Sequence, residues 1–180
     1  MISIDSPVIR TNDFNQVLVF IALAMLTATS NAETLTGRVV SIVDGDTLTL
    51  LDATNTQHKL RLSGIDSPEK SQAYGRSCKQ SLSDMTYDRI VTVEWNKRDR
   101  YGRIIGKVIA GEDDVNLGQI NRGCGWHYKK YQHEQSLSDQ IEYSKAEKLA
   151  KDHQIGLWSV ELPIPPWEWR SQRRNNPDGD

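Results

Sequence analysis

Three short blocks of the sequence hold side chains whose types and spacing suit the chemistry of phosphodiesters. They read Val-Asp-Gly-Asp-Thr at 43–47, Arg-Leu-Ser-Gly-Ile-Asp-Ser-Pro-Glu at 61–69 and Asp-Arg-Tyr-Gly-Arg at 99–103. Taken alone, each block has a plainer interpretation: a turn between strands, the start of a helix and an exposed hairpin tip. Their joint occurrence, at the ends of predicted strands, indicates one site.

The acidic residues of the first two blocks suit a hard cation. Asp46 and Asp66 lie at strand ends that a small barrel brings together, and carboxylates, a carbonyl and waters form the oxygen-rich shell that Ca²⁺ accepts. Arg61 and Arg103 present forked guanidiniums that match the non-bridging oxygens of a phosphodiester. Glu69 is the remaining acid. The set predicts hydrolysis in which charge on the phosphate is stabilised while a water is activated or oriented.

Five strands and three helices are expected to position these blocks. Alternating β-branched and apolar residues predict strands at 35–40, 47–50, 57–65, 90–95 and 104–110. Helical spacing predicts helices at 74–87, 115–122 and 136–151. In the last of these, Leu137, Ile141 and Leu149 mark the expected buried face. The layout predicts an α+β, mainly β fold: a five-stranded Greek-key barrel of the OB type with three helices.

The C-terminal part of the chain is expected to be irregular. A proline cluster at 163–166 predicts a segment without regular structure. Trp167 and Trp169 require a surface to cover, so this segment should pack along the domain. Residues 171–180 are predicted to be a flexible tail.

The first 32 residues are predicted to be a signal peptide. Val17 to Leu26 is an uninterrupted apolar run, too short to span a bilayer but suited to the core of a signal peptide, and Ser30-Asn31-Ala32 supplies small residues for cleavage before Glu33. Because Arg10 is the sole basic residue ahead of the run, an uncleaved membrane anchor is the alternative. The mature domain, 33–170, is therefore expected to be exported, either secreted or periplasmic.

Composition restricts the class of protein. The 180-residue chain has room for one domain with appendages, which excludes two large domains. Hydrophobic residues make up 37% and charged residues 26%, so the chain can form a packed core. The net charge is −2, from 22 basic and 24 acidic residues. A polyanionic partner must therefore be held by a local basic cluster.

The two cysteines, Cys78 and Cys124, are predicted to form a disulfide. An oxidising compartment permits the bridge. It would close the loop between residues 78 and 124 and stabilise the fold by up to roughly 4 kcal/mol. The alternative is a pair of small buried apolar side chains. A zinc site is excluded because the sequence has no Cys-x-x-Cys and no histidine with a paired spacing to either cysteine.

The three blocks, in this order, resemble the staphylococcal nuclease family, also called thermonucleases or micrococcal nucleases. The resemblance covers about residues 35–170 and includes Val-Asn at 115–116, Gly-Leu-Trp at 156–158 and Pro-Pro-Trp-Glu-Trp-Arg at 165–170. It implies an endonuclease that cleaves DNA and RNA with little sequence specificity and leaves 3′-phosphate ends. It implies a monomer with no stable protein partner, and no membrane association once the signal peptide is removed.

The resemblance also implies roles for individual residues. Ca²⁺ would be bound by Asp46, Asp66 and the main-chain carbonyl of Ser67, with Asp44 supporting the metal from behind. Ser67 stands where the staphylococcal enzyme has threonine, which matters little if the carbonyl is the ligand. Arg61 and Arg103 would clamp the phosphate. Glu69 would act on the attacking water, either as a base or by positioning it.

Aromatic residues complete the expected substrate site. Arg100 and Tyr101 form the cationic and aromatic pair expected beside a nucleotide. Tyr128 and Tyr131 are candidates to stack on bases, as is Trp126, and membership of the core is the alternative for all three. Two other functions fit the same fold: an OB-type nucleic-acid-binding module that has lost catalysis, and a carbohydrate-binding barrel. Retention of all the acidic and arginine residues of the three blocks argues against the first.

Overall fold

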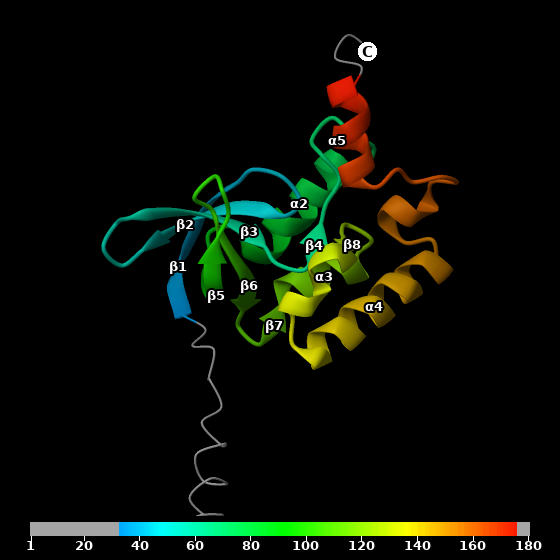
Figure 1. The fold of residues 1–180 in the computed structure, drawn as a ribbon. Helices are drawn as coiled ribbons and strands as arrows, with labels where there is room; N and C mark the ends of the chain where they lie inside the picture. Colours follow the sequence, from blue (N-terminus) through cyan, green and yellow to red (C-terminus); the bar gives the residue numbers. More distant parts are fainter. Residues whose placement is uncertain (1–32, 176–180) are drawn as a thin grey trace, which may run out of the picture. The chain divides into compact units, whose positions relative to one another are not determined.

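The computed structural model describes residues 33–175, in which strands form a barrel and helices pack beside it (Figure 1). The strands are β1 (Glu33–Ile42), β2 (Thr47–Asp52), β3 (Gln57–Leu62), β4 (Ile65–Asp66), β5 (Ile90–Arg98), β6 (Ile104–Ala110), β7 (Asp113–Asp114) and β8 (Trp126–His127). The helices are α2 (Gly75–Thr86), α3 (Val115–Asn121), α4 (Leu137–Asp152) and α5 (Pro166–Asn175), with short 3-10 helices η1 (Lys129–Glu134) and η2 (Gly156–Ser159). Within this part of the chain no helix is both long and apolar enough to cross a membrane. The predicted signal peptide lies outside the described residues.

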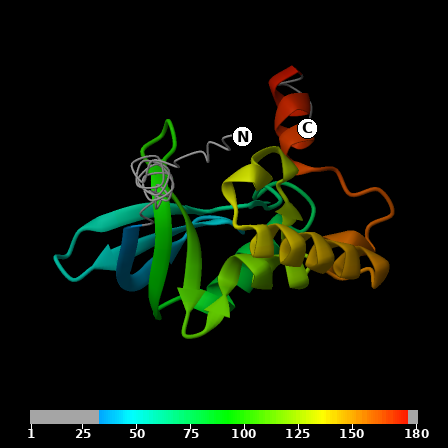
Figure 2. The same cartoon turned by 60° about the horizontal axis from the view of Figure 1, so that its bottom comes forward.

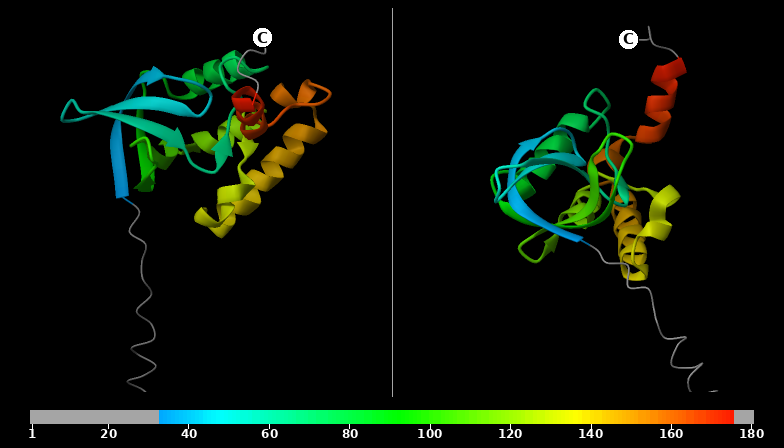
Figure 3. Two further views of the ribbon diagram at one scale, coloured as in Figure 1. Left: turned by 45° about the horizontal axis from the view of Figure 1, so that its top comes forward. Right: turned by 60° about the vertical axis from the view of Figure 1, so that its left-hand side comes forward.

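Five strands close the barrel in the order β3-β2-β1-β5-β6, and the right-hand view of Figure 3 shows the ring that they form. All neighbours in this order are antiparallel, whereas a parallel pairing of β3 with β6 joins the two edges. The short β7 extends the sheet beyond β6. The predicted α+β fold with a five-stranded OB-type barrel is confirmed.

Alternation of apolar and polar residues explains why these segments form strands around one core. On β2 and β3, Leu48, Leu50, Leu60 and Leu62 are at most 1% exposed, and burial of each side chain stabilises the fold by about 1.5–3 kcal/mol. Arg61 lies between two of these leucines and is only partly buried, because successive strand residues face opposite sides of the sheet. The barrel thus places this arginine at its surface.

The third predicted strand, residues 57–65, is divided in the structure. β3 ends at Leu62, and Gly64 adopts a left-handed conformation with φ of 72°. A left-handed residue turns the chain sharply, and glycine adopts this conformation without steric penalty. Ile65 and Asp66 then form β4, which leaves the barrel to pair with β8. The turn therefore moves Asp66 out of the strand that carries Arg61.

The three predicted helices are confirmed to within two residues at each end. Asp114 caps α3 by accepting a hydrogen bond from the Leu117 amide, and Ser136 caps α4 by accepting one from the Asp139 amide, both at 3.0 Å. Gly123 follows α3 with φ of 61°, as expected of a residue that ends a helix. Figure 2 shows α4 lying beside α3.

The predicted buried face of α4 is wrong. Leu137, Ile141 and Leu149 are 72%, 60% and 44% exposed, whereas Tyr143 and Ala150 are 1% exposed. Tyr143 sits at the contact because its hydroxyl donates to the Asp114 carboxylate at 2.8 Å, and small alanines allow the helix to approach the domain closely. Polar bonding and side-chain size, rather than hydrophobicity, therefore select this face.

The predicted irregular C-terminal segment is also corrected. α5 begins at Pro166, and residues 171–175 of the predicted tail belong to this helix, while residues 176–180 lie outside the described part of the chain. Proline lacks the amide hydrogen that a helix interior needs, but the first helical position has no partner for that hydrogen and suits the fixed φ of proline. The proline cluster therefore starts a helix.

Asn116 of α3 connects this helix to the strands that carry the site. Its side chain is fully buried, donates to the Ser63 and Gly106 carbonyls at 2.9 and 3.2 Å and accepts from the Val108 amide at 3.1 Å. Asn116→Ala leaves these backbone groups buried and unpaired, so we expect the free energy of unfolding to fall by about 2–4 kcal/mol in urea denaturation. Asn121→Ala, at an exposed position of the same helix, is the control, and equal losses for both variants would contradict the role.

Candidate functional site

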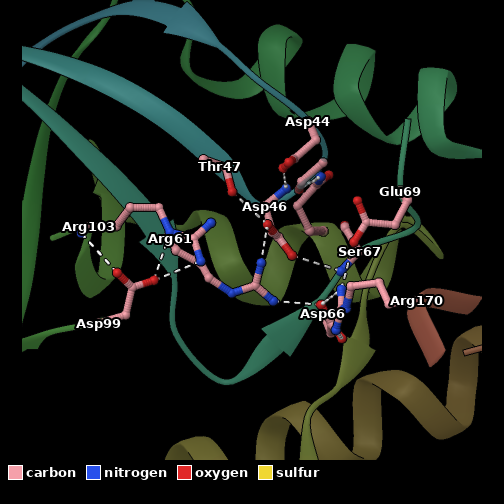
Figure 4. A network of polar contacts seen from close by, with 12 residues as sticks. Asp44, Asp46, Thr47, Arg61, Asp66, Ser67, Glu69, Asp99, Arg103 and Arg170 are labelled. Atoms are coloured by element: carbon pink, nitrogen blue, oxygen red, sulfur yellow. Dashed lines mark hydrogen bonds and ion pairs between the residues drawn. The ribbon is translucent and has the colours of Figure 1, made fainter. Parts of the chain in front are cut away.

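The first two sequence blocks converge on one end of the barrel (Figure 4). Asp44 and Asp46 lie in the turn between β1 and β2, and this turn is joined to β3 by a hydrogen bond from the Leu62 amide to the Asp46 carbonyl at 2.8 Å. The Asp44 carboxylate accepts from the Asp46 amide at 3.0 Å and so shapes the turn. Asp44 therefore supports the loop that carries Asp46, and its predicted role in supporting a metal stays a prediction.

Arg61 joins the two aspartates that were predicted to bind metal. One guanidinium nitrogen, Nη1, donates to Asp46 Oδ1 at 2.7 Å, and Nη2 donates to Asp66 Oδ1 at 2.6 Å. Both carboxylates are almost completely buried, with side-chain exposures of 3% and 0%. The amide of Ser67 donates to the second oxygen of Asp46 at 2.9 Å. The two buried carboxylates thus share the Arg61 guanidinium.

Burial and the closeness of other carboxylates disfavour the ionised forms of Asp44 and Asp66 unless positive charge lies nearby. Burial raises the pKa of Asp66, against the opposing effect of Arg170 and Arg61, which lower it. Burial and the neighbouring Asp46 together raise the pKa of Asp44 to about 7. Carboxylates with raised pKa values become fully ionised when a cation binds beside them. Ionisation of these carboxylates therefore depends on positive charge nearby, which Arg61 and Arg170 supply in this structure.

The available donors fit Ca²⁺ better than a transition metal. Within residues 33–175, no three His, Cys, Asp or Glu side chains gather as a metal site, so side chains alone do not complete a coordination shell. Asp46 and Asp66 supply carboxylates, and the Ser67 hydroxyl is engaged with the Cys124 carbonyl, which leaves the Ser67 carbonyl as the candidate third donor. A shell of few carboxylates, a carbonyl and waters suits Ca²⁺, whereas zinc prefers nitrogen and sulfur.

Gly45 is required for the close packing of this loop. A Cβ atom at this position would lie 2.7 Å from Ser67 Oγ and 2.9 Å from Cys78 Cβ. Only glycine lets the β1–β2 turn approach Ser67 and helix α2 this closely. The approach keeps Asp46 beside the residue that follows Asp66.

The third block, residues 99–103, forms the tip of the β5–β6 hairpin. Arg103 donates to Asp99 from Nε at 2.8 Å, and its Nη2 lies 2.7 Å from the same carboxylate oxygen. Asp99 also accepts from the amides of Tyr101 and Arg103, and these contacts lower its pKa. Arg103 precedes β6, whose Ile105 is paired with Arg61 on β3. Strand alternation places the two arginines on the same outer face.

Asp99 was not predicted as a site residue, although the sequence contained a signal for it. An aspartate followed by a glycine-containing turn commonly accepts from the backbone two residues on. Here that arrangement fixes the hairpin and orients Arg103. Asp99 is thus a residue that positions a predicted phosphate ligand.

Arg100 and Tyr101 lie beside this cluster at the hairpin tip. Tyr101 is 68% exposed, and the guanidiniums of Arg100 and Arg103 lie 4.8 and 5.6 Å from its ring centre. An exposed ring with adjacent positive charge can contact a base and a phosphate together. The structure leaves both residues accessible for their predicted role.

The three candidate stacking residues have different environments. Trp126 packs edge-on against Trp158 at 4.2 Å between ring centres and belongs to a small second core. Tyr131 is 38% exposed, and its ring contacts that of Tyr128 edge-on at 5.1 Å. Tyr128 is covered by Trp167, whose ring is stacked on it at 5.4 Å with planes 14° apart. Tyr131 is therefore the most accessible of the three.

Arg170 of α5 is a residue of the site that the sequence did not predict. Its Nη1 donates to Glu69 Oε1 at 2.7 Å, and its Nη2 donates to Asp66 Oδ2 at 2.6 Å (Figure 4). Glu69 follows β4 in a loop and keeps 37% of its side chain exposed. The signal for Arg170 was weak because it lies 104 residues after Asp66, in a segment predicted to be irregular.

The structure contains Cys78 and Cys124 as buried thiols rather than as the predicted disulfide. Both residues lie beside Gln119, whose side-chain amide donates to the Cys78 carbonyl at 3.0 Å and whose carbonyl accepts from the Cys124 amide at 2.8 Å. An oxidising compartment permits a disulfide, so the bridge stays a prediction for the exported protein. Mass analysis of protein taken from the periplasm, denatured and alkylated without reduction, should find neither thiol labelled. Two labelled thiols would contradict the bridge.

Comparisons with known proteins identify the family to which this chain is similar. A model of the family described as "Staphylococcal nuclease homologue" matches residues 59–160. An "Uncharacterized endonuclease" of Haemophilus influenzae is 40% identical over 159 residues, which are 88% of this chain and 84% of that protein. The "Micrococcal nuclease" of Shigella flexneri is 36% identical over 148 residues, 77% of this chain and 82% of that protein. The Escherichia coli "Protein ParB" is 34% identical over 167 residues, 87% of this chain and 92% of that protein.

The family match and the observed fold agree with the resemblance carried by the three sequence blocks. The matched range includes Arg61, Asp66, Glu69 and Arg103, and the OB-type barrel brings Arg61, Asp66 and Asp46 into contact. The chain therefore belongs to the staphylococcal nuclease family.

Proposed function

We propose that this protein is an exported, Ca²⁺-dependent endonuclease that hydrolyses phosphodiester bonds in DNA and RNA with little sequence selectivity. Membership of the staphylococcal nuclease family supports an endonuclease activity. The observation that best supports the finer proposal is the pairing of Asp46 and Asp66, both buried, with one guanidinium beside the partly exposed Glu69. This group supplies oxygen donors for a cation, a guanidinium for a phosphate and a carboxylate for a water.

The cation would be held by the carboxylates of Asp46 and Asp66 and by the carbonyl of Ser67. When bound, Ca²⁺ would withdraw charge from a phosphoryl oxygen and neutralise part of the charge that develops there. Asp44 would keep the Asp46 loop in shape through its hydrogen bond to the Asp46 amide.

The chain's own side chains would perform the remaining work. Arg61 uses two of its five N–H groups on Asp46 and Asp66. Arg103 uses Nε and Nη2 on Asp99. Each guanidinium therefore keeps N–H groups that can donate to the non-bridging oxygens of a phosphodiester. Those bonds strengthen as negative charge grows on the oxygens in the transition state. The exposed part of Glu69 can contact a water and either accept its proton or orient it for in-line attack.

Weak sequence selectivity follows from the kinds of contact that the site offers. Arg61 and Arg103 suit phosphate, which carries no information about the base. Tyr101 and Tyr131 offer exposed rings, and any base can stack on a ring. DNA and RNA are therefore both proposed as substrates, with products that carry 3′-phosphates by analogy with the family.

The chemistry of the product ends tests this proposal. DNA and RNA oligonucleotides of the same sequence, labelled at the 5′ end, are incubated with the protein and Ca²⁺, and the products are treated with a phosphatase. We expect cleavage of both at many positions and a mobility shift of every labelled product on loss of its 3′-phosphate. Products with 3′-hydroxyl ends would contradict the proposed reaction, and binding without cleavage would favour the OB-type binding module.

Export is tested by the N-terminus of the mature protein. We expect protein recovered from the exported fraction to begin at or near Glu33, after the small residues that end at Ala32. Soluble exported protein that still carried residues 1–32 would contradict cleavage.

A further inference from the structure

The C-terminal helix α5 contacts the candidate site at two separate places. Trp167 and Arg170 are three residues apart in this helix, so their side chains lie on neighbouring parts of one helical face. Arg170 contacts Asp66 and Glu69, and Trp167 contacts Tyr128. Arg170 lies where a metal cation is expected to bind, and Trp167 lies where a base is expected to stack.

Arg170 occupies the carboxylates that a metal cation would need. It donates to both oxygens of Asp66, at 2.6 and 3.2 Å, and to Glu69 at 2.7 Å. Arg61 donates to Asp66 from the other side at 2.6 Å (Figure 4). Because the Asp66 side chain is fully buried, a further cation that binds it must share an oxygen with a guanidinium or displace one. Two cations on one carboxylate repel each other, so Arg170 and a metal cation are competitors.

Trp167 occupies the aromatic face that a base would need. Its ring is stacked on Tyr128 with planes 14° apart and ring centres 5.4 Å apart. This near-parallel arrangement is the one by which nucleobases bind aromatic side chains. The indole therefore covers a ring that is a candidate for substrate binding.

α5 and the segment before it make further contacts outside the five-stranded barrel. Trp167 packs edge-on against Trp126 of β8 with ring centres 5.6 Å apart, and Arg173 donates to Ser71 Oγ at 2.9 Å. Ahead of the helix, the Ile164 carbonyl accepts from the Gln72 side-chain amide at 2.5 Å. Trp169 lines a cavity of about 170 Å³ together with Pro68 and Tyr74. No strand of the barrel pairs with this helix, so α5 can leave the site without breaking the sheet.

We propose that α5 is an autoinhibitory closure of the site, in which Arg170 excludes the metal cation from Asp66 and Trp167 excludes a base from Tyr128. This inference rests on the proposed function. Since the coupling between two ligands of one site is reciprocal, Ca²⁺ and single-stranded nucleic acid release α5, and α5 weakens the binding of both.

Calorimetric titration of Ca²⁺ into the full-length protein tests the first contact. Arg170→Gln removes the competing guanidinium, so we expect Ca²⁺ to bind on the order of tenfold more tightly than to the wild type. Arg173→Gln is the matched control, since it removes the same charge from the same helix but leaves Asp66 and Glu69 untouched; a change of less than about twofold is expected. Arg170→Lys, which keeps the charge and loses the forked geometry, should give an intermediate affinity.

Three outcomes separate the closure from the proposed function. Ca²⁺ binding that is unchanged or weaker in Arg170→Gln, with normal binding by the wild type, overturns the closure alone. Absence of Ca²⁺ binding in the wild type and all variants overturns the metal-dependent function and the closure with it. Tighter binding in Arg170→Gln but equally tight binding in Arg173→Gln shows a general effect of charge and also overturns the specific contact.

A second measurement tests the Trp167 contact and does not depend on the metal. Binding of a short oligothymidylate is measured in chelator for the wild type and for Trp167→Ala. We expect the variant to bind severalfold more tightly, because Tyr128 is uncovered. Weaker binding would show that Trp167 is part of the nucleotide site and would overturn its role in closure.

Hydrogen exchange at residues 166–175 should also become faster when Ca²⁺ is added to the wild type, and unchanged exchange would show that α5 stays in place.

Discussion

Glu69→Gln, Arg61→Lys and Arg103→Lys are each expected to lower the turnover of single-stranded DNA by about 10²–10⁴-fold, with only modest weakening of Ca²⁺ and nucleotide binding. Glutamine keeps the size of Glu69 but cannot accept a proton from water. Lysine keeps the positive charge of each arginine, but its ammonium cannot reproduce the two-pronged bonding that Arg61 makes to Asp46 and Asp66 or that a phosphate would receive.

This prediction requires two measurements on each variant: the rate of cleavage, and calorimetric titration of Ca²⁺ and of a nucleoside bisphosphate. Glu94→Gln and Arg38→Lys are matched controls, because these side chains are exposed on β5 and β1 and should leave turnover unchanged. Near-normal cleavage by Glu69→Gln or Arg103→Lys would refute the assigned roles. A loss of turnover that merely followed a loss of Ca²⁺ binding would reassign the residue to the metal.

Asp46→Ala and Asp66→Ala should instead remove Ca²⁺ binding, weakening it by about a hundredfold or more, and cleavage should fall with it. Each aspartate supplies a buried carboxylate that faces the shared cation position, and the remaining donors are carbonyl and water oxygens. Asp66→Ala also leaves Arg61 and Arg170 without their common partner, so Asp66→Asn is included to separate metal loss from loss of folding.

The comparison variant for the metal prediction is Asp44→Asn. Asp44 accepts from the Asp46 amide, and asparagine can still accept that bond, so Ca²⁺ affinity should change by less than about tenfold. Calorimetry and circular dichroism on the same samples provide the measurement. Unchanged Ca²⁺ affinity in folded Asp46→Ala and Asp66→Asn would remove both residues from the metal site.

The barrel and its five strands were predictable from local patterns, whereas the end of β3 at Leu62 and the separate β4 were not. Alternation on β2 and β3 has a period of two, and a buried strand with one polar face gives the same pattern wherever it occurs. The residues Asp46, Arg61 and Asp66 lie within 21 positions of one another, in a turn and at two strand ends. Short-range geometry was therefore sufficient to bring them together.

The parts that sequence patterns did not predict depend on contacts between distant segments. Arg170 reaches Asp66 across 104 residues, and its helix starts at a proline that local rules associate with irregular structure. The buried face of α4 was predicted wrongly because Tyr143, which is hydrogen-bonded to Asp114, is buried, whereas Leu137 and Ile141 are exposed. The pattern of hydrophobic residues alone does not predict these contacts between distant polar side chains.

The proposed Ca²⁺ dependence is tested most directly by the cleavage of single-stranded DNA. Cleavage is measured first with Ca²⁺, then with excess chelator and finally with Ca²⁺ restored. The site offers the buried carboxylates of Asp46 and Asp66, and among the described residues no three His, Cys, Asp or Glu side chains gather as a metal site. It is therefore expected to need a weakly held, oxygen-bound cation that a chelator removes reversibly. We expect rapid cleavage with Ca²⁺, no cleavage in chelator and full recovery when Ca²⁺ is restored. Cleavage that persists at the same rate in chelator would contradict it.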